Sequence, residues 1–223
     1  MKIIDLTYPV AENMPMYPGT DAPTLQVTST HEEQGFMETL ISLYSHTGTH
    51  IDAPAHLYAN GLTLDKYPVN QFVGKALIVD CRMLEKGEKI PMPLIEEKGN
   101  CLNEADFILF LTGHGKCWGS PDYYYEEFPI LSEEVIEWIN QRELKGIGID
   151  APSFDPVTAD EANQASDELQ NHRTILKTNR TVLIENLCNL EEAGNDLFLL
   201  IALPLNTVNA DGAPARVIAL INS

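Results

Sequence analysis

The sequence predicts an α/β domain built on a mixed, largely buried β-sheet flanked by helices. Short apolar runs bounded by turn residues recur along the 223 residues, and several contain Ile, Val, Leu and Phe at consecutive positions. That pattern is typical of strands covered on both faces. Helical patterns are fewer and lie between these runs. The chain shows no internal repeat and no low-complexity linker, so we expect one domain over residues 1–223.

Eight segments have the length and composition of β-strands. Each is bounded by turn residues, and their alternation with helical segments favours a layered α/β arrangement. The expected strands are Lys2–Leu6, Glu38–Tyr44, Lys75–Cys81, Asp106–Thr112, Gly146–Asp150, Thr181–Asn186, Leu197–Leu203 and Arg216–Ile221.

Two helices are predicted between these strands. The clearer one begins after Ser132, because serine is a favoured N-cap and Val135, Ile136 and Ile139 follow at helical spacing. The second covers about Asp167–Thr178 and places apolar residues on one face. Two further stretches, residues 8–24 with four prolines and residues 112–130 with several glycines, are interpreted as connecting loops.

The charge of the chain excludes several classes of partner. It has 33 acidic and 14 basic residues, a formal charge of −19, which repels nucleic acid and anionic membranes. No apolar run reaches the roughly eighteen residues of a membrane span, and the first residues show no secretory signal pattern. The four cysteines lie at least 16 residues apart with no CxxC motif, which favours free thiols and a cytoplasmic location.

A cluster of histidines carries the strongest functional signal. Three of the six histidines, His46, His50 and His56, fall within eleven residues beside Asp52. Glycine and proline in this segment disfavour a helix, so we interpret it as a strand passing into an irregular turn. Imidazole and carboxylate together bind zinc, manganese or iron, and three such ligands leave positions open for water and substrate. The segment predicts a catalytic metal site, with hydrogen-bonded loop histidines as the alternative.

The segment reads H-x-G-T-H-x-D-x-P-x-H and resembles the signature of the cyclase family of metal-dependent hydrolases, which includes bacterial kynurenine formamidase and isatin hydrolase. The resemblance implies a swivelling β/α/β fold. It extends along nearly the whole chain through motifs at Asp5–Thr7, Pro15–Gly19, Gly148–Pro156, Asn171–His172, Ile184–Leu187, Ala202–Leu205 and Asp211–Arg216.

The resemblance implies a site for one or two divalent metal ions, with Zn(II) expected and Mn(II) as the alternative. His46, His50 and Asp52 would hold the first ion. Asp52 and Glu185 could bridge to a second ion, which His172 would complete. Glu185 also has independent support, because a carboxylate at the end of a buried strand is costly unless it is paired or ligating.

The resemblance also implies roles for His56 and Tyr17. His56 would act as the catalytic acid/base, accepting a proton from water and passing it to the departing amine, a role suited to an imidazole pKa of about 6.5. A fourth metal ligand, or a donor outside the ligand shell, is the alternative for His56. Tyr17 occupies the position where kynurenine formamidases usually carry a substrate-facing Trp, which weakens the case for an aryl formamide substrate.

The sequence therefore predicts a metal-dependent hydrolase of a carbon–nitrogen bond. By resemblance the leading reaction is that of an arylformamidase, which converts N-formylkynurenine to kynurenine and formate in tryptophan catabolism. Alternatives are hydrolysis of a cyclic amide, lactone or small ester, as in isatin hydrolase, and a metal-binding module without catalysis. Glu185, where isatin hydrolases tend to have Gln, favours the formamidase-like arrangement. A small-molecule substrate and a homodimer or homotetramer are expected.

The remaining sequence features give weaker indications of function. No Gly-x-Ser-x-Gly elbow is present, and Cys117 near His114 is a poor candidate nucleophile because no orienting group accompanies it. His114 lines a pocket mouth or lies in a solvated loop, and His31 has no assigned role. The aromatic run Tyr123–Tyr125 is expected to serve packing or a subunit contact.

Overall fold

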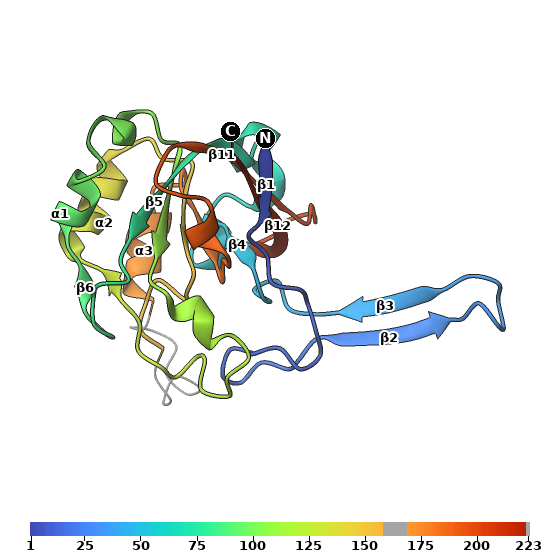
Figure 1. Ribbon diagram of the computed structural model, residues 1–223. Coiled ribbons are helices and arrows are strands. Elements are labelled where there is room, and N and C mark those ends of the chain that lie inside the picture. The colour runs from blue at the N-terminus through green and yellow to red at the C-terminus, as the bar shows by residue number, and fades with distance from the viewer. Residues whose placement is uncertain (158–168, 222–223) are drawn as a thin grey trace.

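The computed structural model describes residues 1–157 and 169–221 (Figure 1). Its main sheet contains β1 (Lys2–Asp5), β4 (His50–Asp52), β5 (Val73–Asp80), β7 (Phe107–Leu111), β9 (Gly146–Ile149), β10 (Val182–Glu185), β11 (Phe198–Pro204) and β12 (Gly212–Ile221). The order is β1-β12-β11-β5-β7-β9-β10-β4, and a pairing of β12 with β4 closes the sheet into a ring. Neighbours from β5 to β10 run parallel, and the other pairs are antiparallel. The predicted mixed sheet is confirmed.

Apolar side chains pack on both sides of the parallel strands. Along β7, Leu109 faces a cluster enclosed by the ring, whereas Ile108 and Phe110 face a second cluster outside it. All three side chains are fully buried. This double burial explains why the strand reads as an uninterrupted apolar run in the sequence.

Helices cover the outer cluster. They are α1 (Met92–Glu96), α2 (Glu133–Gln141) and α3 (Gln170–Leu176). As predicted, α2 follows Ser132, whose Oγ accepts a hydrogen bond of 3.3 Å from the backbone N–H of Val135. The expected start of the second predicted helix at Asp167 lies outside the described residues. None of the described helices is long and apolar enough to cross a membrane.

Several shorter elements were not predicted. Two-residue strands β6 (Lys89–Ile90) and β8 (Ile130–Leu131) pair in parallel beside α2. Single 3-10 turns lie at Pro54–His56, Leu64–Lys66, Val69–Phe72, Gly99–Asn103, His114–Cys117 and Leu190–Glu192.

The predicted strand Glu38–Tyr44 is displaced from the main sheet. It is present as β3 (Glu38–Ser42) and pairs with β2 (Thr24–Ser29), a strand that sequence analysis missed. The two form a hairpin that projects from the body of the molecule (Figure 1). Side chains on β3 are mostly exposed, unlike those of the parallel strands in the main sheet. A short apolar run indicates a strand but does not specify which strand pairs with it.

Residues 50–52 are extended after a bend at Gly48, as expected. The pairing of this segment was not predicted: His50–Asp52 forms β4, which is hydrogen-bonded to β10 on one side and to β12 on the other. Pairing on both edges therefore stabilises the extended backbone of these three residues. The turn itself lies just before the strand, at Gly48.

Candidate metal centre

The chain reverses direction between His46 and His50. Gly48 adopts a φ of +64°, a conformation that favours glycine, and an added Cβ would lie 2.9 Å from the Met14 side chain. Pairing of β4 with β10 then places His50 directly opposite Glu185. Because opposed residues in an antiparallel pair share a face of the sheet, their side chains converge.

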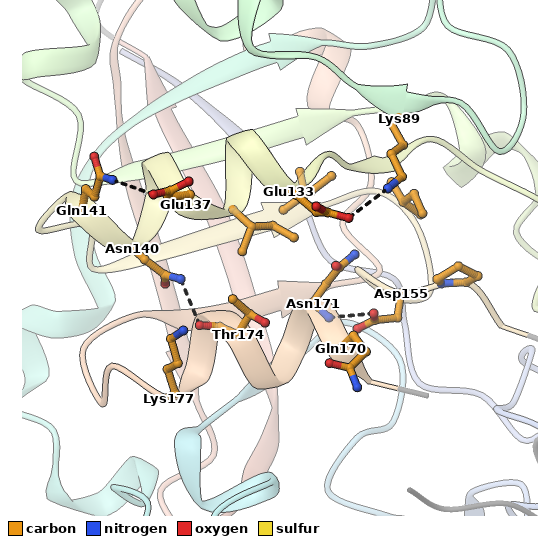
Figure 2. A pocket seen from close by; sticks show the side chains of 14 residues that line it. Lys89, Glu133, Glu137, Asn140, Gln141, Asp155, Gln170, Asn171, Thr174 and Lys177 are labelled. Atoms are coloured by element: carbon orange, nitrogen blue, oxygen red, sulfur yellow. Dashed lines mark hydrogen bonds and ion pairs between the residues drawn. The ribbon is translucent and has the colours of Figure 1, made fainter. Parts of the chain in front are cut away.

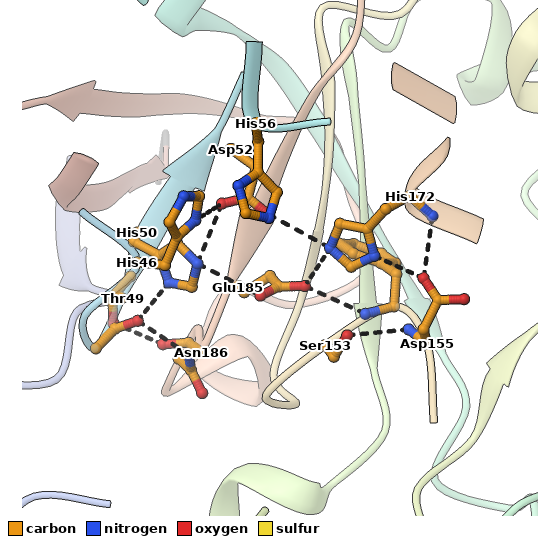
Figure 3. A network of polar contacts seen from close by, with 12 residues as sticks. His46, Thr49, His50, Asp52, His56, Ser153, Asp155, His172, Glu185 and Asn186 are labelled. Atoms are coloured by element: carbon orange, nitrogen blue, oxygen red, sulfur yellow. Dashed lines mark hydrogen bonds and ion pairs between the residues drawn. The ribbon is translucent and has the colours of Figure 1, made fainter. Parts of the chain in front are cut away.

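Helix α3 contributes His172, the last of the residues predicted to bind a metal ion. His172 is 3% exposed, and its Nε2 lies 3.0 Å from Glu185 Oε1 and 3.4 Å from Asp52 Oδ2. His50 Nε2 approaches the same two carboxylates, at 3.2 Å from Asp52 Oδ1 and 3.4 Å from Glu185 Oε2. Figure 3 shows these side chains turned toward one another, together with His46. The structure thus brings together all five residues for which a ligand role was predicted.

Two of these histidines are held by acceptors outside the cluster. His50 Nδ1 lies 2.8 Å from the backbone oxygen of Gly48. His172 Nδ1 lies 2.7 Å from Asp155 Oδ2. In each case the outer contact occupies one ring nitrogen and leaves Nε2 facing the carboxylates. Histidines that bind metals in proteins are usually oriented in this way.

His46 is held in the same manner but with the opposite ring nitrogen. Its Nδ1 lies 2.6 Å from Asp52 Oδ1, and its Nε2 lies 3.0 Å from Asp211 Oδ2. Sequence analysis assigned no role to Asp211 or to Asp155. Both lie within motifs of the family resemblance, and a carboxylate inside such a motif was the available signal.

The cluster fits a divalent metal ion by the chemistry of its donors. Two sets, His46–His50–Asp52 and Asp52–His172–Glu185, each have one ligand atom per residue within 4.8 Å of the others, and every member except the partly buried His46 is buried. They share Asp52 and contain imidazole and carboxylate without thiolate, the donor set of zinc or manganese. Burial of this many polar groups is costly unless they are neutralised. A third set of this kind, His46–His56–Asp211, is less buried.

Without a cation, protons balance the carboxylates of the cluster. Burial opposes protonation of His46, but Asp52 and Asp211 outweigh burial and raise the His46 pKa to about 10. Burial likewise opposes protonation of His172, yet Glu185 and Asp155 hold its pKa well above the usual value. Two imidazoles are therefore held protonated at sites where a metal ion would compete with the protons.

The carboxylates respond in the opposite sense. Burial alone would raise the pKa of Asp52, but the charges of His46 and His50 keep that pKa well below its usual value. The hydrogen bond from His46 lowers the pKa of Asp211 to about 2. Both carboxylates are ionised near neutral pH and carry the negative charge that a cation needs.

His56 stands beside the cluster rather than inside it. It lies in the 3-10 turn Pro54–His56, and its ring centroid is 4.0 Å from that of His46. Its Nδ1 is 3.7 Å from Asp211 Oδ2, and 27% of its side chain is exposed. Burial lowers the His56 pKa to about 4, so the imidazole is neutral at pH 7 and has a free lone pair.

A cavity of about 280 Å³ opens onto these side chains. Its walls include three tyrosines, Tyr17, Tyr44 and Tyr124, in addition to the cluster. The rings of Tyr17 and Tyr124 meet edge to face, with centroids 5.8 Å apart. A packing role or a subunit contact was expected for Tyr123–Tyr125, and the structure places Tyr124 in the cavity wall. Tyr123 next to it is fully buried and donates a hydrogen bond of 2.8 Å to Asn186 Oδ1.

A second cavity is larger, at about 920 Å³, and lies between α2 and α3 (Figure 2). Its lining includes the charged residues Lys89, Glu133 and Lys177. It contains no histidine, and Asp155 separates it from His172. The cavity between α2 and α3 has the greater volume, but the smaller cavity is lined by the histidines and carboxylates. We therefore place the candidate site in the smaller cavity.

The weaker sequence candidates do not join the site. His114 is buried, and its Nε2 lies 2.9 Å from the backbone oxygen of Tyr123, which indicates a packing role. Burial raises the pKa of the Cys117 thiol, whose sulfur lies 3.7 Å from Glu126. A nucleophilic cysteine needs a lowered pKa, so Cys117 is not supported. His31 is exposed in the turn between β2 and β3.

Comparisons with known proteins agree with the family resemblance. Residues 4–156 match the family model described as "Putative cyclase". Kynurenine formamidases of Bacillus cereus and Bacillus thuringiensis are each 30% identical over 216 residues, covering 96% of this chain and 95% of theirs.

Solved structures share the fold. An isatin hydrolase bound to the product analogue thioisatinate has a TM-score of 0.84 at 19% identity, covering 100% of this chain and 93% of its own. A predicted metal-dependent hydrolase from Bacillus stearothermophilus has a TM-score of 0.74 at 27% identity, covering 98% and 97%.

Proposed function

The chain belongs to the cyclase family, and from that premise we propose that it is a metal-dependent hydrolase of the carbon–nitrogen bond of a linear amide. One observation carries the proposal: two largely buried histidine–carboxylate sets share Asp52 and border a cavity that His56 also lines. The proposed reaction is that of an arylformamidase, which releases kynurenine and formate from N-formylkynurenine. The Bacillus cereus kynurenine formamidase, which is similar over nearly its whole length, supports this substrate.

We assign the metal ligands as the sequence predicted. His46, His50 and Asp52 hold one divalent ion, and Asp52, Glu185 and His172 hold a second when two ions bind. Zn(II) is the proposed ion, and Mn(II) suits the same donors. When bound, such an ion lowers the pKa of water and polarises a carbonyl oxygen.

His56 moves the proton in the proposed reaction. Its neutral ring accepts a proton from the water molecule whose oxygen attacks the amide carbon. The carbon–nitrogen bond then breaks, and His56 returns the proton to the departing nitrogen, so that the products are an amine and a carboxylic acid. The low pKa of His56 keeps the accepting form populated at neutral pH.

Two carboxylates outside the ligand sets orient the imidazoles. Asp155 accepts from His172 Nδ1–H, and Asp211 accepts from His46 Nε2–H. Each contact fixes which ring nitrogen is available to a metal ion. We assign Asp155 and Asp211 as positioning residues, whose loss weakens metal binding rather than the chemical step.

The cavity suits a small aromatic substrate. Aromatic rings pack against one another edge to face or offset, and Tyr17, Tyr44 and Tyr124 supply such surfaces next to the cluster. The volume of about 280 Å³ matches a compact ligand. The fold shared with isatin hydrolase keeps hydrolysis of a cyclic amide, lactone or small ester as the second candidate.

Metal analysis combined with an acyl substrate panel tests the proposal. The panel contains N-formylkynurenine, N-formylaniline, isatin, a lactone and an aryl ester. Bound metal with hydrolysis of the formamides supports it, whereas activity confined to isatin or the lactone selects the second candidate. Bound metal without hydrolysis of any member identifies a binding module and overturns the enzyme proposal.

We also propose that residues 1–223 form one domain, and that the protein acts in the cytoplasm on a small molecule as a homodimer or homotetramer. The closed ring formed by strands from both ends of the chain supports one domain. A single cooperative unfolding transition tests the domain, fractionation of cells tests the location, and sedimentation tests the assembly.

A further inference from the structure

The ring of Tyr124 separates the cavity at the metal cluster from a neighbouring space, here called the outer hollow. The cavity has a volume of about 280 Å³, and the outer hollow has a volume of about 210 Å³. Among the described residues, Tyr124 alone lines both spaces. It is nevertheless a buried residue, at 6% exposure. One packed ring is therefore the partition between two spaces, each of which has room for part of a small molecule.

The outer hollow has walls from two loops that lie far apart in the sequence. Residues 13–16 contribute one wall, and residues 119–121 contribute the other together with Tyr125. Most of the lining residues are Met, Pro or Tyr, whose side chains offer apolar surface, and methionine adapts readily to the shape of a ligand. None of the described residues in this lining is a histidine, an acid or a cysteine. The outer hollow thus suits an apolar group and supplies no chemistry of its own.

Neighbouring rings hold Tyr124 in place. Besides the edge-to-face contact with Tyr17, its ring meets that of Tyr123 at a centroid distance of 5.3 Å and an interplanar angle of 89°. Tyr123 is itself fixed by its hydrogen bond to Asn186 and by an edge-to-face contact with Trp118, at 5.2 Å between centroids. Side chains packed in this way occupy one rotamer, so the partition is a fixed wall rather than a swinging gate.

We propose that Tyr124 sets the largest substrate that the site accepts, because its ring closes the cavity off from the outer hollow. This inference rests on the proposed function, since it takes the substrate to be an amide bound at the metal cluster. A formyl group and one aryl ring stay on the inner side of the partition, whereas a long acyl chain needs the space beyond it. A single methylene that does not fit an apolar pocket changes kcat/KM by about 10–200-fold. The substrate class is therefore restricted to amides of short acyl groups.

Ligands that chelate the metal ion and differ only in chain length test the partition without turnover. Acetohydroxamate and decanohydroxamate share one chelating group, so calorimetric titration of the zinc-loaded protein isolates the contribution of the alkyl chain. In the wild type we expect affinity to stop rising once the chain fills the cavity. In Tyr124→Ala the two spaces are joined, and each further buried CH₂ group tightens binding about fourfold. Decanohydroxamate then binds Tyr124→Ala at least about tenfold more tightly than it binds the wild type, whereas the affinity for acetohydroxamate is unchanged.

Two controls separate the joining of the spaces from the mere loss of a ring. Tyr17→Ala removes an equal ring at a residue that lines the cavity but not the outer hollow, so it gives a much smaller gain for decanohydroxamate. Ser120→Phe places a ring in the outer hollow, which Ser120 lines. Combined with Tyr124→Ala it restores the wild-type dependence on chain length, and alone it leaves both affinities unchanged.

The decisive quantity is the ratio of the two dissociation constants, because partial unfolding weakens both ligands alike. Tyr124→Leu repeats the measurement if Tyr124→Ala does not fold by circular dichroism. A ratio that stays at the wild-type value, a ratio equal to that of Tyr17→Ala, or failure of both ligands to bind the wild type overturns the proposal. The acyl substrate panel decides the proposed function separately. A wild type that hydrolyses no amide, with a shifted ratio in Tyr124→Ala, would retain the partition and lose the amide substrate.

Discussion

The metal cluster and the hairpin formed by β2 and β3, residues 24–42 and here called the arm, differ from ordinary residue burial in opposite ways. The cluster buries Asp52, Glu185 and His172, each at most 5% exposed, whereas the arm leaves Val27 and Ile41 about half exposed. Charged groups are rarely fully buried, and apolar groups are rarely exposed together. The cluster therefore needs a compensating positive charge, which the proposed metal ion would supply, whereas the arm leaves apolar side chains exposed in the single chain.

The two regions also differ in the number of contacts that hold their side chains in place. Cluster side chains are fixed by β4, β10 and α3 and by hydrogen bonds to Asp155, Asp211 and Gly48. The arm is attached to the body at its root and has few internal contacts beyond its own ladder. A preformed ligand set suits chemistry that requires fixed geometry, whereas an extended arm suits association.

Replacement of His56 gives the largest expected effect and separates chemistry from metal binding within the cluster. His56→Ala lowers kcat by about 10²–10⁴-fold because the proton acceptor is lost. Metal content by atomic emission stays at the wild-type value. The matched control, His31→Ala, removes an exposed histidine in the arm and leaves kcat unchanged. Loss of metal together with activity would instead place His56 among the ligands.

Replacement of Asp155 tests the outer support of the cluster. Asp155→Asn removes the carboxylate that fixes His172 and weakens binding of the metal ion by about 10–100-fold, measured by competition with a chelator. The visible spectrum of the cobalt-substituted protein changes as well, which a purely structural role would not cause. Asp196→Asn, at an exposed position, serves as the control. Unchanged affinity in Asp155→Asn would remove its positioning role.

Metal affinity should depend on pH, because protons and the cation compete for His46. The metal-free protein holds the His46 pKa at about 10, above its usual value, so each metal ion bound there displaces a proton. Between about pH 7 and pH 10 the apparent affinity rises about tenfold per pH unit for that proton, then levels off. Calorimetry in buffers of different ionisation enthalpy counts the released protons. An affinity independent of pH would contradict the ligand assignment of His46.

Replacement of Tyr17 tests the aromatic wall of the cavity. Tyr17→Ala raises KM for an aryl formamide by up to about tenfold, with a smaller change in kcat, because a ring contact is worth about 0.5–1.5 kcal/mol. The non-aromatic N-methylformamide is much less affected. Tyr125→Ala alters a half-exposed tyrosine that does not line the cavity and provides the control. Equal losses on both formamides would show that Tyr17 does not contact an aryl group.

The smallest expected effect concerns the arm. Ile41→Lys changes a side chain that is 58% exposed in the single chain, so the unfolding free energy of the monomer changes by less than about 0.5 kcal/mol. Urea unfolding at dilutions where the chain is monomeric measures this. A large loss would mean that Ile41 packs within its own chain, which would weaken the contrast between arm and cluster.

Much of the site followed from local sequence, because His46, His50, Asp52 and His56 lie within eleven residues. The parallel strands were equally accessible, since burial on both faces leaves continuous apolar runs. The convergence of His172 and Glu185 on Asp52 depends on sheet order and on the placement of α3, and only the family resemblance anticipated it.

Other features could not be predicted because they are set by tertiary contacts. Asp155 and Asp211 acquire their roles from the distance to an imidazole far away in sequence. The extended conformation of His50–Asp52 was predicted, but its pairing with β10 and β12 depends on the order of strands in the sheet. The sequence of β3 is that of an ordinary strand, because a local pattern does not reveal whether other side chains will cover the apolar residues.

The central claim is that the buried cluster holds catalytic metal, and anomalous diffraction from crystals of the zinc-loaded protein tests it most directly. The account predicts a peak at the zinc edge between His46, His50 and Asp52, with a second peak between Asp52, His172 and Glu185 when two ions bind. Zinc peaks that lie only elsewhere, in crystals of protein that hydrolyses a formamide, would contradict it.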